Sequence, residues 1–183
     1  MLQGKYYLKI SSENYAMPYD KVIYWDSSIF IAWLKNEQRP LGEMDGVLEY
    51  VYLVEAKKVK LITSTLTRTE VFEANLTSEV REKYSKLLSR RNVQLIDADL
   101  RVTELARDLR EYYQSQSNID GLPGLTTADA IHLATAIHYK VDEFHTFDNG
   151  KKGGRSLLSL NGNVAGHHLT ICKPPVSQYR LPI

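Results

Sequence analysis

The sequence has little of several features that mark other classes of protein. Cys172 is the only cysteine among 183 residues, which excludes an internal disulfide and any cysteine-rich metal site. No apolar run approaches the roughly 18 residues that cross a bilayer, and the first residues contain no continuous apolar segment typical of a secretory signal. We therefore expect a cytoplasmic protein that does not enter a membrane.

A large excess of charge of one sign is also absent, since 23 Lys and Arg residues stand against 22 Asp and Glu residues. The formal net charge of +1 counts at first against a nucleic-acid partner, because phosphates select for basic proteins. The charges are unevenly placed, however. Residues from 149 to the end contain five Lys or Arg residues and no acid, so an acidic body precedes a basic C-terminal tail. The overall balance therefore does not exclude RNA.

The composition is that of a globular protein, with 43% hydrophobic and 25% charged residues. A chain of this length fits one domain. Residues 1–20 are polar and rich in Tyr, and we interpret them as an N-terminal extension. Residues 21–183 are expected to form the single domain.

Short runs of β-branched and aromatic residues alternate with helical periodicities along this domain. Strands are expected at residues 22–25, 61–64, 93–96, 144–147 and 169–172. Helices are expected at about residues 26–34, 43–57, 72–88, 102–113 and 126–137, the third range holding one helix or two. The alternation predicts an α/β fold, a three-layer sandwich with a largely parallel five-stranded sheet.

Four acids lie at or just after expected strand ends or at the starts of helices: Asp26, Glu70, Asp129 and Asp148. Each has a structural explanation as well. Asp26 and Asp129 fit helix caps, Glu70 fits an exposed helix position, and Asp148 begins an Asp-Asn-Gly turn. Taken together they lie where ligands bind in parallel sheets, outside the carboxyl ends of the strands.

Such acids would repel one another if they converged, by about 4 kcal/mol for a pair at 4 Å and an effective dielectric constant of 20. A divalent cation would relieve that repulsion, and Mg²⁺ and Mn²⁺ prefer carboxylate and water ligands. Acids with such an ion at a strand-end cleft indicate phosphate-ester chemistry.

Four motifs carry a resemblance to a known family: residues 22–28, 67–71, 127–136 and 144–148. In order and spacing they resemble the PIN domain family, most closely the VapC-type toxins of toxin–antitoxin pairs, over about residues 20–150. The resemblance implies an endoribonuclease that depends on Mg²⁺ or Mn²⁺ and cleaves RNA with a metal-activated water. It implies Asp26, Glu70, Asp129 and Asp148 as catalytic acids, the three Asp residues as metal ligands, and Ser28 and Thr146 as supporting polar residues.

The resemblance also implies an RNA substrate, an antitoxin protein as a partner and a homodimer. Lys151, Lys152 and Arg155 follow Asp148 in a Gly-rich segment, and we expect them to contact the RNA backbone. The alternative is a catalytically silent PIN-fold module that binds RNA or serves as a scaffold in a larger complex.

Other assignments remain open at this stage. Glu73 lies one helical turn from Glu70 and would replace it if the register were shifted. His132 and His145 could contribute to a metal site with the acids, although a partly buried, hydrogen-bonded His is commoner. Cys172 has no obvious base nearby and is interpreted as a packing residue. A dinucleotide-binding site is excluded, because no G-x-G-x-x-G motif follows the first strand.

Overall fold

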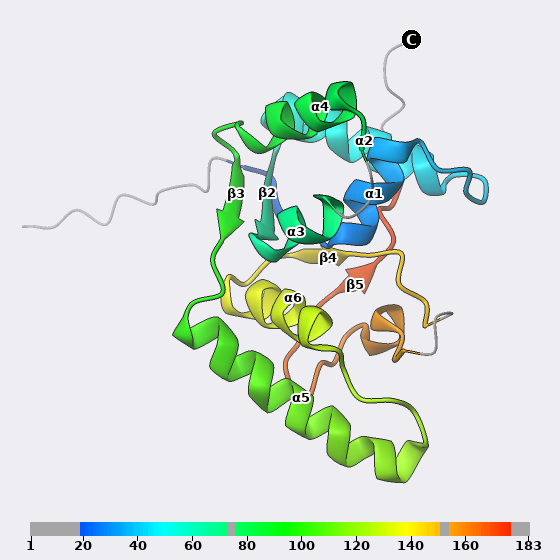
Figure 1. Ribbon diagram of the computed structural model, residues 1–183, viewed down its shortest axis with the longest axis vertical. Helices are drawn as coiled ribbons and strands as arrows, with labels where there is room; N and C mark the ends of the chain where they lie inside the picture. The colour runs from blue at the N-terminus through cyan, green and yellow to red at the C-terminus, as the bar shows by residue number, and fades with distance from the viewer. Residues whose placement is uncertain (1–18, 73–75, 151–153, 177–183) are drawn as a thin grey trace, which may run out of the picture.

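The computed structural model describes residues 19–72, 76–150 and 154–176 (Figure 1). Nearly all of the expected N-terminal extension therefore lies outside the described residues. Five strands form one sheet: β1 Lys21–Trp25, β2 Val59–Ser64, β3 Val93–Ile96, β4 Glu143–His145 and β5 Ile171–Cys172. The strand order is β3-β2-β1-β4-β5, and every neighbouring pair is parallel. The predicted parallel five-stranded sheet is confirmed.

Six α-helices and one short 3-10 helix accompany the sheet among the described residues: α1 Ser27–Lys35, α2 Glu43–Glu55, α3 Leu66–Phe72, α4 Ser78–Leu88, α5 Leu100–Asp120, α6 Thr127–His138 and η1 Leu157–Leu160. None of these helices is long and apolar enough to cross a membrane.

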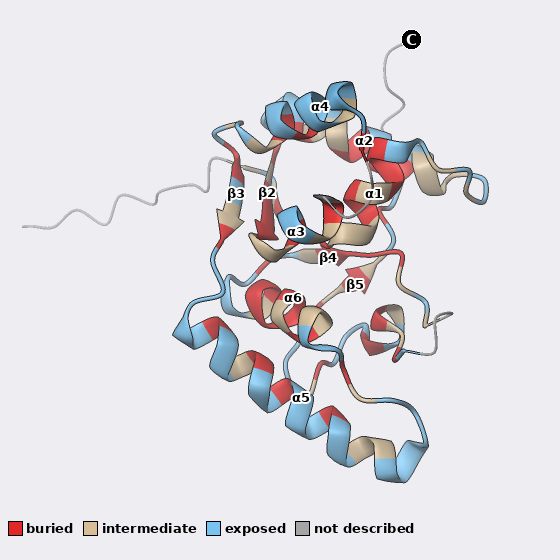
Figure 2. Cartoon of the chain, in the orientation of Figure 1, coloured by how far each residue is buried: buried red, intermediate tan, exposed pale blue. Residues whose placement is uncertain are grey.

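Alternating side chains of the strands pack into two hydrophobic cores, one on each face of the sheet (Figure 2). Tyr24 and Phe144 point to the face that α5 and α6 cover, where they meet Leu133. Trp25 points to the opposite face, which α1, α2 and α4 cover. The result is the predicted three-layer sandwich, with β1 at its centre and the carboxyl end of β1 leading directly to Asp26.

Several elements differ from the sequence-based expectation. The fourth strand ends at His145 instead of residue 147, and the fifth begins at Ile171 instead of residue 169. The apolar repeat over 72–88, expected to hold one helix or two, contains α4 and only the last residue of α3, because Thr77 caps a new start by accepting a hydrogen bond from the Val80 N–H. Helix α3 begins at Leu66, before the apolar repeat that predicted it. Helix α5 continues past the end of its apolar stripe to Gly121, whose positive φ of 69° terminates it.

Candidate metal and nuclease site

Asp26 is held at the end of β1 by donors from two directions. Its side chain caps α1 by accepting from the Ile29 N–H at 3.3 Å and from the Ser28 hydroxyl at 2.6 Å. Its other oxygen accepts from the Thr146 hydroxyl. Ser28 and Thr146, which the sequence indicated as supporting polar residues, therefore both contact Asp26. The carboxylate is only 5% exposed.

Asp148 is joined to Asp26 through Thr146. The Thr146 hydroxyl oxygen, which donates to Asp26, accepts a hydrogen bond from the Asp148 N–H at 2.9 Å. The Asp148 side chain accepts from the N–H groups of Gly150 at 3.0 Å and Leu157 at 3.4 Å. The expected Asp-Asn-Gly turn is therefore present, and it fixes the carboxylate beside the carboxyl end of β4.

Asp129 lies in the first turn of α6, where Thr126 is the N-cap. The Asp129 N–H donates to the Thr126 hydroxyl oxygen at 3.1 Å, and that hydroxyl donates to Asp129 Oδ2 at 2.6 Å. The expected capping interaction is therefore present as well. It orients the Asp129 carboxylate through Oδ2 only, since no contact of Oδ1 is found among the described residues.

Glu70, on α3, contacts the neighbouring layer through His132. The His132 Nε2 lies 2.8 Å from Glu70 Oε2, and its Nδ1 lies 2.6 Å from the Tyr24 hydroxyl. His132 is 2% exposed. Of the two alternatives for this residue, the buried, hydrogen-bonded His is the one that fits the geometry. Glu73, the alternative to Glu70, lies outside the described residues.

The electrostatics connect Asp129 with Asp148 and Glu70. Burial raises the pKa of Asp26 above its ordinary value. Burial also raises the pKa of Asp129, and the negative charges of Asp148 and Glu70 raise it further. Neither Asp26, Asp129 nor Asp148 forms an ion pair with Lys or Arg in the described part of the chain. Among the described residues, no Lys or Arg side chain neutralises the negative charge of this site.

This donor set fits Mg²⁺ or Mn²⁺, because it consists of carboxylate and hydroxyl oxygens. No three of the acids bring their oxygens within 4.8 Å of one another in the described residues. Mg²⁺ commonly keeps several of its waters and takes only one or two carboxylates directly. The wider spacing therefore suits ligation that is partly through water.

One other group of metal-ligating side chains lies on the face of the sheet that α2 covers: Glu143, His145 and Cys172, with ligand atoms within 4.8 Å. Its hydrogen bonds argue against an ion. The Trp25 indole N–H, which can only donate, contacts His145 Nδ1 at 3.0 Å. The proton of the neutral ring is therefore on Nε2, which faces Glu143 at 2.9 Å and has no lone pair for a metal.

The remaining contacts of Glu143 complete this network. Its carboxylate accepts from Lys21 at 2.6 Å and from the Tyr50 hydroxyl at 3.0 Å. Contacts with His145 and Lys21 lower the pKa of Glu143 to about 2. Burial and the Glu143 charge raise the pKa of the Cys172 thiol to about 11, so it stays protonated. We interpret the group as a structural network that connects α2 to the sheet.

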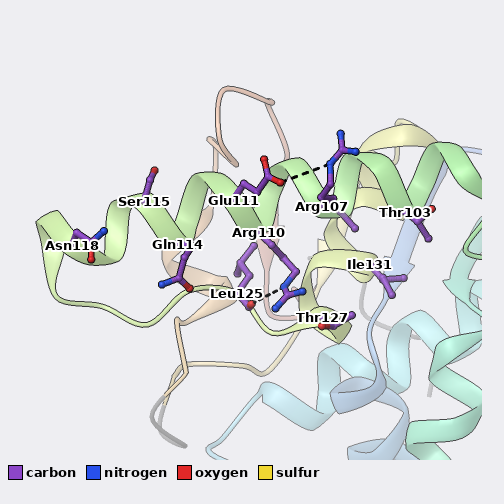
Figure 3. A pocket seen from close by; sticks show the side chains of 11 residues that line it. Thr103, Arg107, Arg110, Glu111, Gln114, Ser115, Asn118, Leu125, Thr127 and Ile131 are labelled. Atoms are coloured by element: carbon purple, nitrogen blue, oxygen red, sulfur yellow. Dashed lines mark hydrogen bonds and ion pairs between the residues drawn. The ribbon is translucent and has the colours of Figure 1, made fainter.

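A groove of about 640 Å³ lies between α5 and α6 (Figure 3). Its rim includes Arg110, whose Nε donates to the Leu125 carbonyl, and its floor includes Ile131. None of the four acids lines it. Positions two apart on an α-helix face directions about 200° apart, so Thr127 lines the groove while Asp129 points elsewhere. The groove is separate from the acid site.

Arg155, which the sequence indicated as a contact to the RNA backbone, is bonded within the protein. Its guanidinium makes two hydrogen bonds to Asp120, at 2.9 and 3.2 Å, and its Nε donates to the Pro123 carbonyl. The residue is 6% exposed and lies against the Tyr113 ring. Arg155 therefore fastens the end of α5 to the segment after β4. Lys151 and Lys152 lie outside the described residues.

Comparisons with known proteins agree with this architecture. A family model for the PIN domain matches residues 23–152, a range that includes all four acids. The curated proteins give no match at the sequence level. Three similar solved structures are VapBC2 from Rickettsia felis bound to a DNA fragment from their promoter, a toxin–antitoxin complex from Klebsiella pneumoniae, and Mycobacterium tuberculosis VapC20, a Sarcin-Ricin loop cleaving toxin.

The likeness to these structures is one of fold. The R. felis structure is 17% identical with a TM-score of 0.55, and the match covers 82% of this chain and 98% of that one. The K. pneumoniae structure is 22% identical with a TM-score of 0.52, covering 80% and 99%. VapC20 is 13% identical with a TM-score of 0.50, covering 70% and 91%. The fold is thus that of the VapC toxins, and the chain belongs to the PIN domain family.

Proposed function

We propose that this protein is an endoribonuclease that requires Mg²⁺ or Mn²⁺ and hydrolyses RNA phosphodiester bonds. One observation carries the proposal. Asp26 follows β1, Asp148 follows β4 and Asp129 lies in the first turn of α6, and the described residues provide no Lys or Arg ion pair for them. A site that keeps unneutralised acids at a cost in folding energy is typical of metal-dependent phosphoryl chemistry.

Each acid has a distinct part in this proposal. Asp26, Asp129 and Asp148 hold the ion, and the hydroxyls of Ser28 and Thr146 keep Asp26 in its orientation. Glu70 lies on α3 and orients the attacking water or the outer waters of the ion. A bound divalent ion supplies positive charge beside the phosphate oxygens and lowers the pKa of water. The lysines at 151 and 152 remain proposed contacts to the RNA backbone.

We further propose that the protein is the toxin of a toxin–antitoxin pair and acts in the cytoplasm, with an antitoxin protein and a second copy of itself as partners. Support comes from the fold shared with structures whose descriptions name such pairs. Growth arrest on expression, relieved by co-expression of a small protein encoded next to the gene, would support this. Full growth at high expression of the active enzyme would contradict it.

The test of the activity is cleavage of a structured RNA by the purified protein. Product should form with Mg²⁺ or Mn²⁺, disappear with chelator, and fall on the order of 100-fold or more in Asp129→Asn. Asp45→Asn, which changes an exposed acid on α2, is the matched control and should cleave normally. Cleavage that persists in both chelator and Asp129→Asn would contradict the proposal.

The alternative of a silent PIN-fold module predicts a different pattern in the same assay. Such a protein would bind RNA or the metal ion and yield no product with any divalent ion. Binding measured beside cleavage therefore separates the two functions.

A further inference from the structure

The contacts around His132 connect three elements beside the acid site. Tyr24 lies on β1 and is fully buried, His132 lies on α6, and Glu70 lies on α3. The Tyr24 ring stacks on Phe144 with centroids 5.0 Å apart and meets the His132 ring edge-on. Packing therefore fixes both rings before any hydrogen bond is considered.

The direction of these hydrogen bonds follows from the Ser64 backbone N–H, which can only donate. The Ser64 N–H donates to the Tyr24 hydroxyl oxygen at 3.1 Å. The single phenolic proton then has the His132 Nδ1, 2.6 Å away, as its acceptor. A phenol has an ordinary pKa of about 10, so it carries this proton at neutral pH. The His132 Nδ1 is thus an acceptor, and the ring proton is on Nε2.

This arrangement directs a donor at Glu70. The Nε2–H faces Glu70 Oε2 at 2.8 Å, and the Glu70 side chain is 27% exposed. One carboxylate oxygen is therefore held by His132, and Oε1, which contacts no other side chain in the described ranges, is open to a ligand or a water. An imidazole that presents a fixed N–H to a carboxylate restricts the rotation of that carboxylate.

We propose that His132 is a positioning residue that holds Glu70 through its Nε2–H, with Tyr24 setting the ring tautomer. The expected effect on the rate of RNA cleavage rests on the proposed nuclease function. The contact between His132 and Glu70 rests on geometry alone. The hydrogen bonds from Ser64 through Tyr24 and His132 to Glu70 fix Glu70 relative to β1 and α6. Asp26 directly follows β1, and Asp129 lies on α6. His132 does not touch the metal or the RNA in this proposal.

Two variants of His132 separate positioning from packing. In His132→Gln the amide nitrogen reaches the place of Nε2 and can donate to Glu70. In His132→Asn the shorter amide reaches the place of Nδ1, keeps a partner for Tyr24 and cannot reach Glu70. Both variants bury one amide in the same space. A comparison of His132→Asn with His132→Gln therefore isolates the loss of the Glu70 contact from the change in packing.

We expect His132→Gln to retain most of the kcat for RNA cleavage and His132→Asn to lose about 10- to 100-fold, with little change in KM. Glu70→Gln combined with His132→Asn should lose little more than Glu70→Gln alone, because the two changes remove one interaction. Equal kcat for wild type and His132→Asn would overturn the proposal while leaving the nuclease function in place.

A second measurement examines the contact without any activity. In ¹⁵N-His-labelled wild-type protein, the side-chain ¹⁵N spectrum should show His132 as the Nε2–H tautomer, with a signal that shifts in Glu70→Gln. An Nδ1–H tautomer, or a signal indifferent to Glu70→Gln, would overturn the inference. If the wild type cleaves no RNA, the nuclease proposal fails and this spectrum still decides whether His132 holds Glu70.

Discussion

At the scale of single residues, the acid site combines structural and chemical roles in the same side chains. Asp26 caps α1, Asp129 contacts the cap of α6, and Asp148 closes a turn. Each of these contacts fixes a carboxylate without neutralising it, since the donors are hydroxyl and backbone N–H groups. The helix caps and the turn therefore also orient the carboxylates that we propose as metal ligands.

Asp26→Asn tests whether the buried charge destabilises the fold. Burial raises the pKa of Asp26, so the folded chain binds its proton more tightly than the unfolded chain. Stability is therefore lost as pH rises through the folded pKa. In chelator at pH 7 the variant should melt at a higher temperature than wild type. This advantage should shrink as pH falls toward about 3.9, the ordinary pKa of Asp.

Calorimetric scans over this pH range provide the measurement, and addition of Mg²⁺ provides a control. The ion should raise the melting temperature of the wild type more than that of Asp26→Asn, because the variant lacks a ligand. A variant that is less stable than wild type at pH 7 in chelator would mean that the cap contributes more than the charge costs.

At the scale of elements, Thr126 at the start of α6 both caps the helix and holds the side chain of Asp129. Thr126→Ala removes the N-cap and the hydroxyl that holds Asp129 Oδ2. We expect a loss of about 1 kcal/mol in the free energy of unfolding and about 10-fold weaker Mn²⁺ binding. Thr126→Ser keeps the hydroxyl and should behave like wild type. Urea unfolding measures the stability and titration calorimetry measures the Mn²⁺ binding. Equal Mn²⁺ affinity in Thr126→Ala and Thr126→Ser would contradict a role of the Thr126 hydroxyl in metal binding.

The sequence predicted these elements where local signals were strong. The strand at residues 93–96 was predicted with its observed bounds, and the four acids were placed at the correct edge of the sheet. The last two turns of α5 were missed, because Gln114, Ser115 and Gln116 continue no apolar stripe. Those turns depend on a tertiary contact, the pairing of Arg155 with Asp120, which no local pattern encodes.

The same limit applies to the candidate site. Asp26, Ser28 and Thr146 were grouped by motif, and their contacts agree with that grouping. The contact of Tyr24 with His132 spans 108 positions of the sequence and was not predicted. The helical spacing of His132 from Asp129 was visible, but the strand position of Tyr24 indicated only a core residue.

At the scale of the whole molecule, part of the positive charge of residues 149–183 is paired with acids of the folded protein. Arg155 pairs with Asp120 and Lys173 pairs with Glu43, so two cations of the basic tail are used within the protein. Fewer cations of the tail are therefore available to the proposed RNA substrate than its composition suggests. Lys151 and Lys152, which follow Asp148 closely in the sequence, are the remaining proposed contacts to RNA.

Lys151→Ala combined with Lys152→Ala should flatten the salt dependence of RNA binding. Each lost phosphate contact lowers the slope of log K against log[salt] by roughly 0.7 for single-stranded RNA. Binding measured by fluorescence anisotropy across a salt series gives this slope. Lys173→Ala is the control, since Lys173 is paired with Glu43, and should leave the slope unchanged. An unaltered slope in the double variant would remove these lysines from the RNA interface.

The location of the bound metal ion tests the central claim most directly. Crystals grown with Mn²⁺ and measured for anomalous scattering would reveal the ion without reference to activity. The account predicts a peak among the carboxylates of Asp26, Asp129 and Asp148, absent in Asp26→Asn. A peak instead at Glu143, His145 and Cys172, with none beside the three Asp residues, would contradict it.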